Sequence, residues 1–188
     1  MTSIRSRCSR RRRVHRMRAM AAIRRILTAE ESILRERTKR VRSFDASLRR
    51  LLDDMLVTMR DAPGVGLAAN QVGVPLQVAV IEIEGKITEL INPQIVKSSG
   101  EQLDWEGCLS IPGFVAEVTR AAKVTAKARD RNGREFRIKG DELLARALQH
   151  EIDHLNGTLY IDYLESLEEL VRVSEAPDEV TEETAAGI

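Results

Sequence analysis

Two histidines four residues apart lie in a stretch of the chain whose apolar residues repeat at helical spacing. Residues 141–157 have leucines and alanines at intervals of three and four, an aspartate at the start that can cap a helix, and a glycine at the end that can stop one. Residues four apart on a helix point the same way, so the imidazoles of His150 and His154 can reach one metal ion, with Glu151 beside them. The sequence therefore predicts a metal-binding helix.

A catalytic metal ion usually has three protein ligands and an open position for water. Cys108 is the strongest candidate for the third ligand, because it is the only cysteine outside the N-terminal arginine run and follows a glycine that permits close approach of the backbone. Its thiolate is a strong ligand for a borderline-soft divalent ion. A metalloprotease of the HExxH type would instead need a later acid, since no histidine follows His154. The acids available for that alternative are Glu165, Glu168 and Glu169.

Charge is distributed unevenly along the chain. Residues 1–19 hold eight arginines and no acid, residues 174–188 hold five acids and no base, and the residues between them hold 22 basic and 24 acidic side chains. Cations gathered in one terminal run, in a chain with only six aromatic residues, do not predict a folded nucleic-acid-binding face. No DNA partner is expected.

The two ends are expected to lie outside one folded domain at residues 20–173. Residues 1–19 have the Arg-rich, acid-free composition of an organellar transit peptide or a disordered basic arm. They would be absent, wholly or in large part, if translation began at Met17 or Met20. The acidic tail, residues 174–188, has too little apolar surface to bury and is expected to be disordered.

No apolar run approaches the roughly 20 residues that a membrane-spanning helix needs, so no membrane association is expected. The two cysteines, Cys8 and Cys108, fit a reduced cytosolic compartment better than a disulfide framework. We therefore expect a location in the bacterial cytoplasm, or in an organelle if the first 19 residues are a genuine transit segment.

A first helix and a central group of strands are predicted from the spacing of apolar residues. The helix is expected over residues 44–61 with Ser43 or Asp45 as its N-cap, followed by a loop rich in glycine and proline over residues 62–75. The segments that look extended are residues 77–83, 87–91, 115–119, 123–129 and 135–138. These predict an antiparallel sheet region, with the first two strands forming a hairpin.

Turn signals complete this prediction. Asn132-Gly133 is the signal of a two-residue hairpin turn before the last of these strands. After the metal-binding helix, residues 159–164 could form a strand or an irregular return, and a last helical turn is possible near residues 167–173.

Three segments resemble the signature motifs of the peptide deformylases. They are Gly64-Val65-Gly66-Leu67-Ala68-Ala69-Asn70-Gln71, Glu106-Gly107-Cys108-Leu109-Ser110 and Gln149-His150-Glu151-Ile152-Asp153-His154. Their order and spacing agree with that family as well, over about residues 23–164. The resemblance implies an α+β fold in which antiparallel sheets pack around a central helix that carries the HExxH motif. It also implies the reaction, which is hydrolytic removal of the formyl group from the N-terminal formylmethionine of newly synthesised proteins, with release of formate.

The resemblance implies a role for each main site residue. Cys108, His150 and His154 would hold one divalent ion, with Fe(II) favoured and Zn, Ni or Co also suited to these ligands. Glu151 would accept a proton from the attacking water and return it to the departing amine. The side-chain amide of Gln71 and the backbone N–H of Leu109 would stabilise charge on the formyl oxygen.

Substrate contacts are expected at Val65, Gly66, Glu106 and Gly107. Gly64 and Gly66 would let an extended peptide lie against the backbone while a pocket accepts the methionine side chain. The expected partners are nascent formyl-Met polypeptides near the ribosome, bound by a monomeric enzyme.

Two residues keep open roles at this point. Asp153 could hydrogen-bond a metal-bound imidazole or could be a plain solvated acid. Arg146 stands where many relatives have an apolar residue near the methionine pocket. A non-catalytic relative, with the basic arm on ribosomal RNA, would not need Glu151 or Gln71, so their presence favours the enzyme.

Overall fold

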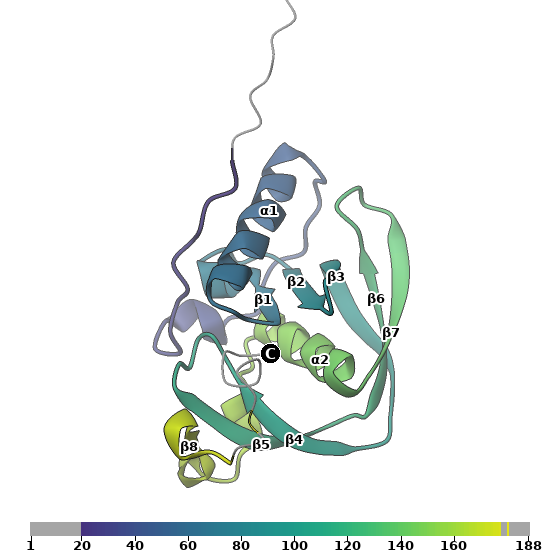
Figure 1. The fold of residues 1–188 in the computed structure, drawn as a ribbon. Coiled ribbons are helices and arrows are strands. Elements are labelled where there is room, and N and C mark those ends of the chain that lie inside the picture. The colour runs from purple at the N-terminus through teal and green to yellow at the C-terminus, as the bar shows by residue number, and fades with distance from the viewer. Residues whose placement is uncertain (1–19, 178–179, 181–188) are drawn as a thin grey trace, which may run out of the picture.

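The computed structural model describes residues 20–177 and residue 180. Figure 1 shows one helix, α2, lying between two sheets, with the second helix, α1, across one end of the molecule. The α-helices and β-strands of the described residues are, in chain order, α1 (Ala46–Asp61), β1 (Gly66–Ala68), β2 (Val78–Ile83), β3 (Lys86–Ser99), β4 (Gln102–Gly107), β5 (Phe114–Arg120), β6 (Lys123–Arg129), β7 (Glu135–Asp141), α2 (Glu142–Asn156) and β8 (Val171–Arg172). The expectations for residues 1–19, and for most of the tail, lie outside the described residues.

Both sheets are antiparallel. The larger has the strand order β1-β2-β3-β6-β7, and the smaller has the order β4-β5-β8. Apolar side chains of α2 such as Leu148, Ile152 and Leu155 pack in the core of the larger sheet. The predicted α+β fold, with antiparallel sheets around the helix that carries residues 150–154, is confirmed.

The first helix forms where the sequence predicts it. Asp45 is its N-cap, and its carboxylate accepts hydrogen bonds from the backbone N–H groups of Ser47 and Leu48. The apolar stripe of α1, which includes Met55 and Met59, packs on β1 and β2 in a second core cluster. Neither α1 nor α2 is long and apolar enough to cross a membrane.

Three strands appear where none is predicted: β1, β4 and the two-residue β8. β1 lies inside the segment expected to be a loop, and Leu67 pairs with Val80 of β2. β4 pairs along its whole length with β5, and Glu106 lies opposite Ala116. β1 has three residues, all buried, and β4 mixes exposed polar with buried residues, so neither has the alternation that marks a half-buried strand.

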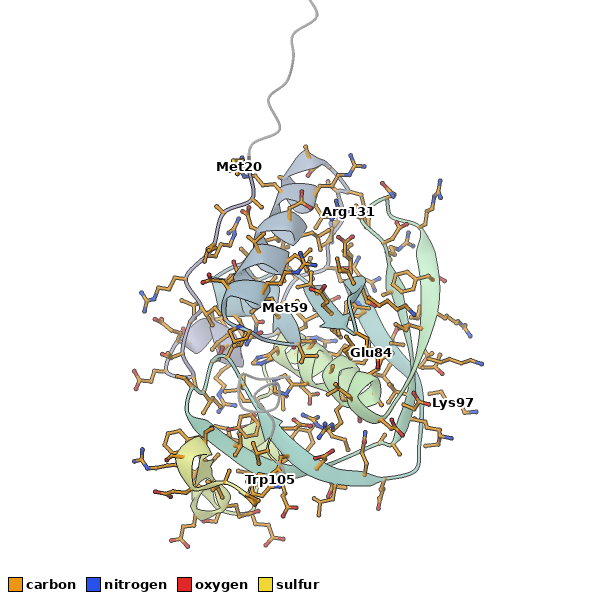
Figure 2. The ribbon with its side chains drawn as sticks, viewed as in Figure 1. Met20, Met59, Glu84, Lys97, Trp105 and Arg131 are labelled. Atoms are coloured by element: carbon orange, nitrogen blue, oxygen red, sulfur yellow. The ribbon has the colours of Figure 1, made fainter. Side chains whose placement is uncertain are left out.

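The hairpins differ from prediction in length. β2 and β3 form the expected hairpin through a turn at Glu84 and Gly85, both with positive φ, but β3 continues to Ser99 through two register shifts. The connection from β6 to β7 is longer than two residues, since Asp130 donates its N–H to the carbonyl of Arg134. Arg131 in this connection is labelled in Figure 2 beside α1.

Two predictions beyond the sheets are also refined. Residues 159–164 form a 3₁₀ turn, Tyr160–Tyr163, and not a strand. The last helical turn is the 3₁₀ turn Leu167–Glu169, which is followed by β8.

Gly157 ends α2 in the left-handed region, with φ 84°, and its N–H reaches the carbonyls of Asp153 and His154. A Cβ at this position would lie 2.6 Å from the carbonyl oxygen of Arg35, whereas a Cβ at Gly85, with φ 74°, would meet nothing within 4 Å. The two glycines therefore share a backbone conformation but differ in the space around them.

We expect Gly157→Ala to lower the free energy of unfolding by clearly more than Gly85→Ala. The Gly85 substitution should cost only the left-handed backbone penalty of about 1–2 kcal/mol. The measurement is urea unfolding of both variants against the wild type. Equal losses in the two variants would show that the contact with Arg35 does not limit this position.

Candidate metal centre

Three potential ligands from two distant parts of the chain meet at one point. Cys108 follows the last residue of β4, and His150 and His154 lie one turn apart on α2. The ligand atoms of these three residues lie within 4.8 Å of one another, and all three side chains are buried. Among the described residues this is the one cluster of its kind. The glutamates that would serve a metalloprotease, Glu165, Glu168 and Glu169, are exposed and lie outside it.

The surroundings of these side chains fit a divalent ion. Nε2 of His154 lies 3.2 Å from the sulfur of Cys108. Nε2 of His150 is buried with no hydrogen-bond partner among the described residues, and such a nitrogen costs free energy unless something binds it. One thiolate and two imidazoles are a donor set suited to Fe(II), Zn, Ni or Co.

Glu106 fixes the orientation of His150. The side chain of Glu106 is fully buried, and one of its oxygens lies 3.2 Å from Nδ1 of His150. Arg120 donates to both oxygens of this carboxylate, at 2.9 and 3.0 Å. Burial alone would raise the pKa of Glu106, but the hydrogen bonds from His150 and Arg120 outweigh it and lower the pKa to about 2. The carboxylate thus holds the Nδ1 side of the ring and leaves Nε2 facing Cys108 and His154.

This arrangement gives the side chain of Glu106 a positioning role that the sequence did not predict. Its carboxylate is occupied by His150 and Arg120 and is not available to a substrate. Asp153, whose role the sequence leaves open, accepts from Arg120 and from the hydroxyl of Tyr163, the latter at 2.9 Å. Asp153 is therefore neither a direct imidazole partner nor a plain solvated acid.

Sequence reasoning did not find Arg120. It ends β5 at a position where alternate residues are buried, and its side chain is only 3% exposed. An arginine in the buried register of a strand is the signal that could have revealed it, because a buried guanidinium needs an acidic partner.

Glu151 lies on the same turn of α2 and is completely buried. Neither carboxylate oxygen has a hydrogen-bond partner among the described residues. Burial raises the pKa of Glu151 well above its ordinary value, and the nearby charge of His150 acts in the opposite sense. A Cβ on Gly66 would come within 2.2 Å of Oε1 of Glu151, so the lack of a side chain at Gly66 makes room for this carboxylate.

Gln71 reaches the same point from the other sheet. Its amide oxygen accepts from the N–H of Ala68 at 2.8 Å, which directs the amide nitrogen toward Ser110, at 3.1 Å, and the sulfur of Cys108, at 3.7 Å. Leu109 follows Cys108 directly, in a turn in which the N–H of Ile111 bonds the carbonyl of Cys108. The donor amide of Gln71 is therefore held in place before any substrate arrives.

The remaining expected residues lie around this centre. Val65 is buried in the core, and its carbonyl accepts from the N–H of Glu82. Gly107 is the last residue of β4 and pairs with Val115. Arg146 is buried, and its guanidinium contacts the carbonyl of Trp105 at 3.0 Å and pairs with Asp104.

We expect Arg120→Ala to destabilise the protein by about 3–5 kcal/mol, because it leaves the buried Glu106 carboxylate without its main partner. The metal affinity should fall by about tenfold or more as His150 loses its fixed orientation. Urea unfolding and metal analysis after dialysis measure the two effects.

Arg60→Ala is the matched control, since Arg60 pairs with Glu82 through two hydrogen bonds of 2.7 and 2.8 Å at the surface. This variant should change stability little and metal content not at all. The role given to Arg120 would be wrong if both variants lost the same stability and the same metal.

Comparisons with known proteins show which family the chain resembles. A family model described as "Polypeptide deformylase" matches residues 23–170. The chain is 51% identical over 166 residues to a curated protein from Dehalococcoides mccartyi (strain CBDB1) named "Peptide deformylase", covering 86% of this chain and 99% of that protein. It is 52% identical over 141 residues to a protein of the same name from Alkaliphilus metalliredigens (strain QYMF), covering 75% and 96%.

Solved structures give the same result. The crystal structure of a peptide deformylase from Legionella pneumophila has a TM-score of 0.77 and 52% identity, covering 79% of this chain and 89% of that one. A peptide deformylase from Synechococcus elongatus, solved in complex with actinonin, has a TM-score of 0.74 and 43% identity, covering 77% and 80%.

Proposed function

The chain belongs to the peptide deformylase family, and from this premise we propose which of its residues perform the family's reaction. The protein is a metallohydrolase that removes the formyl group from the N-terminal formylmethionine of newly synthesised polypeptides. The observation that carries the assignment is the convergence of Cys108, His150 and His154, with the buried carboxylate of Glu151 beside them.

Cys108, His150 and His154 are the metal ligands of this proposal. When bound, a divalent ion supplies a Lewis acid that polarises the formyl oxygen and lowers the pKa of a water molecule toward neutrality. Fe(II) is the proposed physiological ion, and Zn, Ni or Co can use the same ligands. The side chain of Glu106 acts through His150 by fixing its ring. The contact of Glu106 with substrate stays a prediction.

Glu151 is the acid/base of the reaction. It accepts a proton from water as the water oxygen bonds the formyl carbon, and it returns a proton to the amine nitrogen as the C–N bond breaks. The products are formate and a free N-terminal amine. The unpartnered carboxylate supports this role, because no described side chain competes for the proton.

Gln71 and Leu109 stabilise the charge that develops on the formyl oxygen. The amide nitrogen of Gln71 is already directed at Cys108, and the backbone N–H of Leu109 follows that ligand in the chain. Donors held in place before the reaction cost no reorganisation when the charge appears.

The peptide itself is proposed to lie against Val65, Gly66 and Gly107. β1 is the edge strand of the larger sheet, so one side of its backbone is free of a neighbouring strand. An extended peptide can add to such an edge through main-chain hydrogen bonds, which accept any sequence after methionine.

The wider setting is proposed as follows. The catalytic domain spans residues 20–173 and acts as a monomer in the bacterial cytoplasm, on chains that are still close to the ribosome. The family's substrate, an N-terminal formylmethionine, is present only on newly made polypeptides, which supports this placement.

We expect Glu151→Gln to reduce formate release from a formyl-Met peptide by about 10²–10⁴-fold or more while the protein still holds its metal. The assay couples formate detection to metal analysis of the same sample, purified without oxygen. Glu142→Gln, at an exposed position on the same helix, is the control and should keep full activity. Formate release at the wild-type rate from the Glu151 variant would refute the acid/base assignment.

We also expect Gly66→Ala to lower kcat by about 10²-fold, because the added Cβ displaces the Glu151 carboxylate. The metal content should not change, since neither residue is a ligand in this proposal. Gly85→Ala, which adds a Cβ into open space, should leave kcat unaltered. An active Gly66→Ala enzyme would mean that the position of Glu151 is not set by β1.

A further inference from the structure

A short surface segment before α1 presents four exposed cations. Residues 37–42 alternate between exposed basic side chains and the buried residues Thr38 and Val41. The exposed members, which we call the basic strip, are Arg37, Lys39, Arg40 and Arg42. No ion pair joins any of them to another of the residues that the structure describes.

The basic strip is held in place through its backbone. Lys39 donates its N–H to the carbonyl of Pro75 and accepts from the N–H of Gln77, both at 2.8 Å. The side-chain amide of Asn92 clamps Val41, accepting from its N–H at 2.8 Å and donating to its carbonyl at 2.9 Å. The cations therefore project from a fixed backbone, which lowers the ordering cost of binding a partner.

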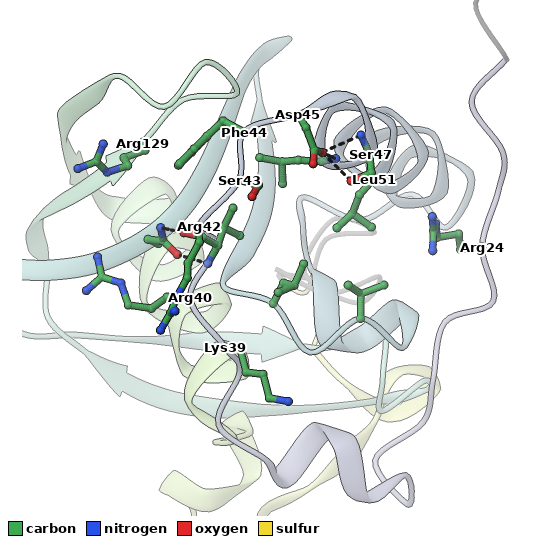
Figure 3. A pocket seen from close by; sticks show the side chains of 15 residues that line it. Arg24, Lys39, Arg40, Arg42, Ser43, Phe44, Asp45, Ser47, Leu51 and Arg129 are labelled. Atoms are coloured by element: carbon green, nitrogen blue, oxygen red, sulfur yellow. Dashed lines mark hydrogen bonds between the residues drawn. The ribbon is translucent and has the colours of Figure 1, made fainter.

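Two depressions lie beside the basic strip and share Arg40, Asn92 and Arg129. The first, of about 1160 Å³, lies against α1, and the second, of about 770 Å³, lies against β3, β6 and α2. In Figure 3 the labelled side chains of Arg40, Arg42 and Arg129 lie on one side of the first depression, and Arg24 lies on the other.

The charge of this surface is strongly positive. Its cationic lining residues are Arg24, Arg37, Lys39, Arg40, Arg42, Lys127 and Arg129. Its acidic lining residues are Asp45, Glu135 and Asp153. Asp45 caps α1, and Asp153 pairs with Arg120. Three of the seven cations have acidic partners, because Arg24 pairs with Asp54 and both Lys127 and Arg129 pair with Glu135, so the excess of positive charge lies in the basic strip. The near-neutral total for the middle of the chain hides this local excess of cations.

The basic strip and its depressions lie on the opposite side of α2 from the metal centre. Ile152, Asp153 and Asn156 of α2 line the second depression. At 100° per residue, Ile152 and Asn156 point away from the side of the helix that carries His150 and His154. A partner bound here would leave the metal centre open to a polypeptide.

We propose that the basic strip and its two depressions bind the phosphate backbone of RNA. Five of the seven cations are arginines, whose forked guanidinium groups bind phosphate oxygens in pairs. The choice of RNA rests in part on the proposed function, since newly made polypeptides are found next to ribosomal RNA.

An anionic membrane fits this surface less well. Membrane-surface binding takes apolar side chains that insert below the headgroups. The large apolar residues of the first depression, such as Val41, Leu48 and Leu51, are buried, and Phe44 is half-buried.

The test is fluorescence anisotropy of a short labelled RNA stem-loop with the full chain and with the variant K39E/R40E/R42E. We expect the dissociation constant to rise by at least about tenfold at low salt. The dependence of log K on log salt should become shallower by about 0.7–0.9 for each phosphate group that the variant no longer binds. The N-terminal arginine run is present in both proteins, so its own contribution to binding is common to both.

The matched control is K97E/K123E/K139E, which reverses three exposed lysines around a separate depression. Figure 2 shows Lys97, near the end of β3, at the right of the molecule and away from α1. This variant has the same net charge as the first, and its dissociation constant for RNA should stay within about twofold of wild type. An equal loss in both variants, or no loss in the first, would overturn the proposal.

Two further measurements separate the alternatives. If the first variant lost binding to vesicles of phosphatidylserine and phosphatidylcholine but kept its affinity for RNA, the partner would be a membrane and the proposal would be wrong.

Formate release from a formyl-Met peptide should be the same in both variants and the wild type, which also verifies that both variants are folded. If the charge reversal unfolds the chain, the variant K39Q/R40Q/R42Q gives the same test, with a smaller expected rise in the dissociation constant for RNA. A failure of deformylation with RNA binding intact would count against the proposed function alone.

Discussion

The buried pair of Glu106 and Arg120 ties together the three elements on which the metal centre is built. Glu106 lies near the end of β4, two residues before Cys108. Arg120 ends β5, and the carboxylate of Glu106 reaches His150 on α2. Two buried charges carry a large desolvation cost that only close geometry offsets, and here both oxygens of the acid are satisfied. The main effect of the ion pair is therefore to position the ligands, because it fixes where Cys108 lies relative to α2.

The larger sheet supplies the other half of the site by coming unusually close to α2. Gly66 leaves the space in which the Glu151 carboxylate lies, and a Cβ on Gly64 would come within 2.8 Å of the side chain of Leu109. Gln71 follows β1 and places its amide beside Cys108. The site thus lies between two sheets, with ligands from the smaller sheet and the helix, and a positioned donor from the larger sheet.

Local sequence patterns predicted the elements that depend on local rules. The apolar period and the Asp45 cap gave α1, the period and Gly157 gave α2, and the four-residue spacing of His150 and His154 placed both rings on one face. The convergence of Cys108 on that face depends on a contact with α2, more than forty residues later in the chain. It could be inferred only from the chemistry of a thiolate and from resemblance.

Features set by tertiary contacts were missed or misassigned. β1 and β4 are defined by their partners and not by alternation, and the role of Glu106 depends on Arg120, whose importance appears only when β5 is paired with β4. Net charge also misled: summing the middle of the chain gave near neutrality, while the fold gathers seven cations around the basic strip. A net charge summed over the sequence does not show how the fold distributes charged side chains over the surface.

The most direct test of the metal centre is X-ray absorption spectroscopy of the protein purified without oxygen, with its native ion in place. The account predicts one sulfur neighbour at about 2.3 Å and two imidazole nitrogens at about 2.0–2.1 Å, the distances typical of such ligands on a zinc-like ion. A first shell of nitrogen and oxygen atoms with no sulfur would contradict it, because Cys108 would then not be a ligand.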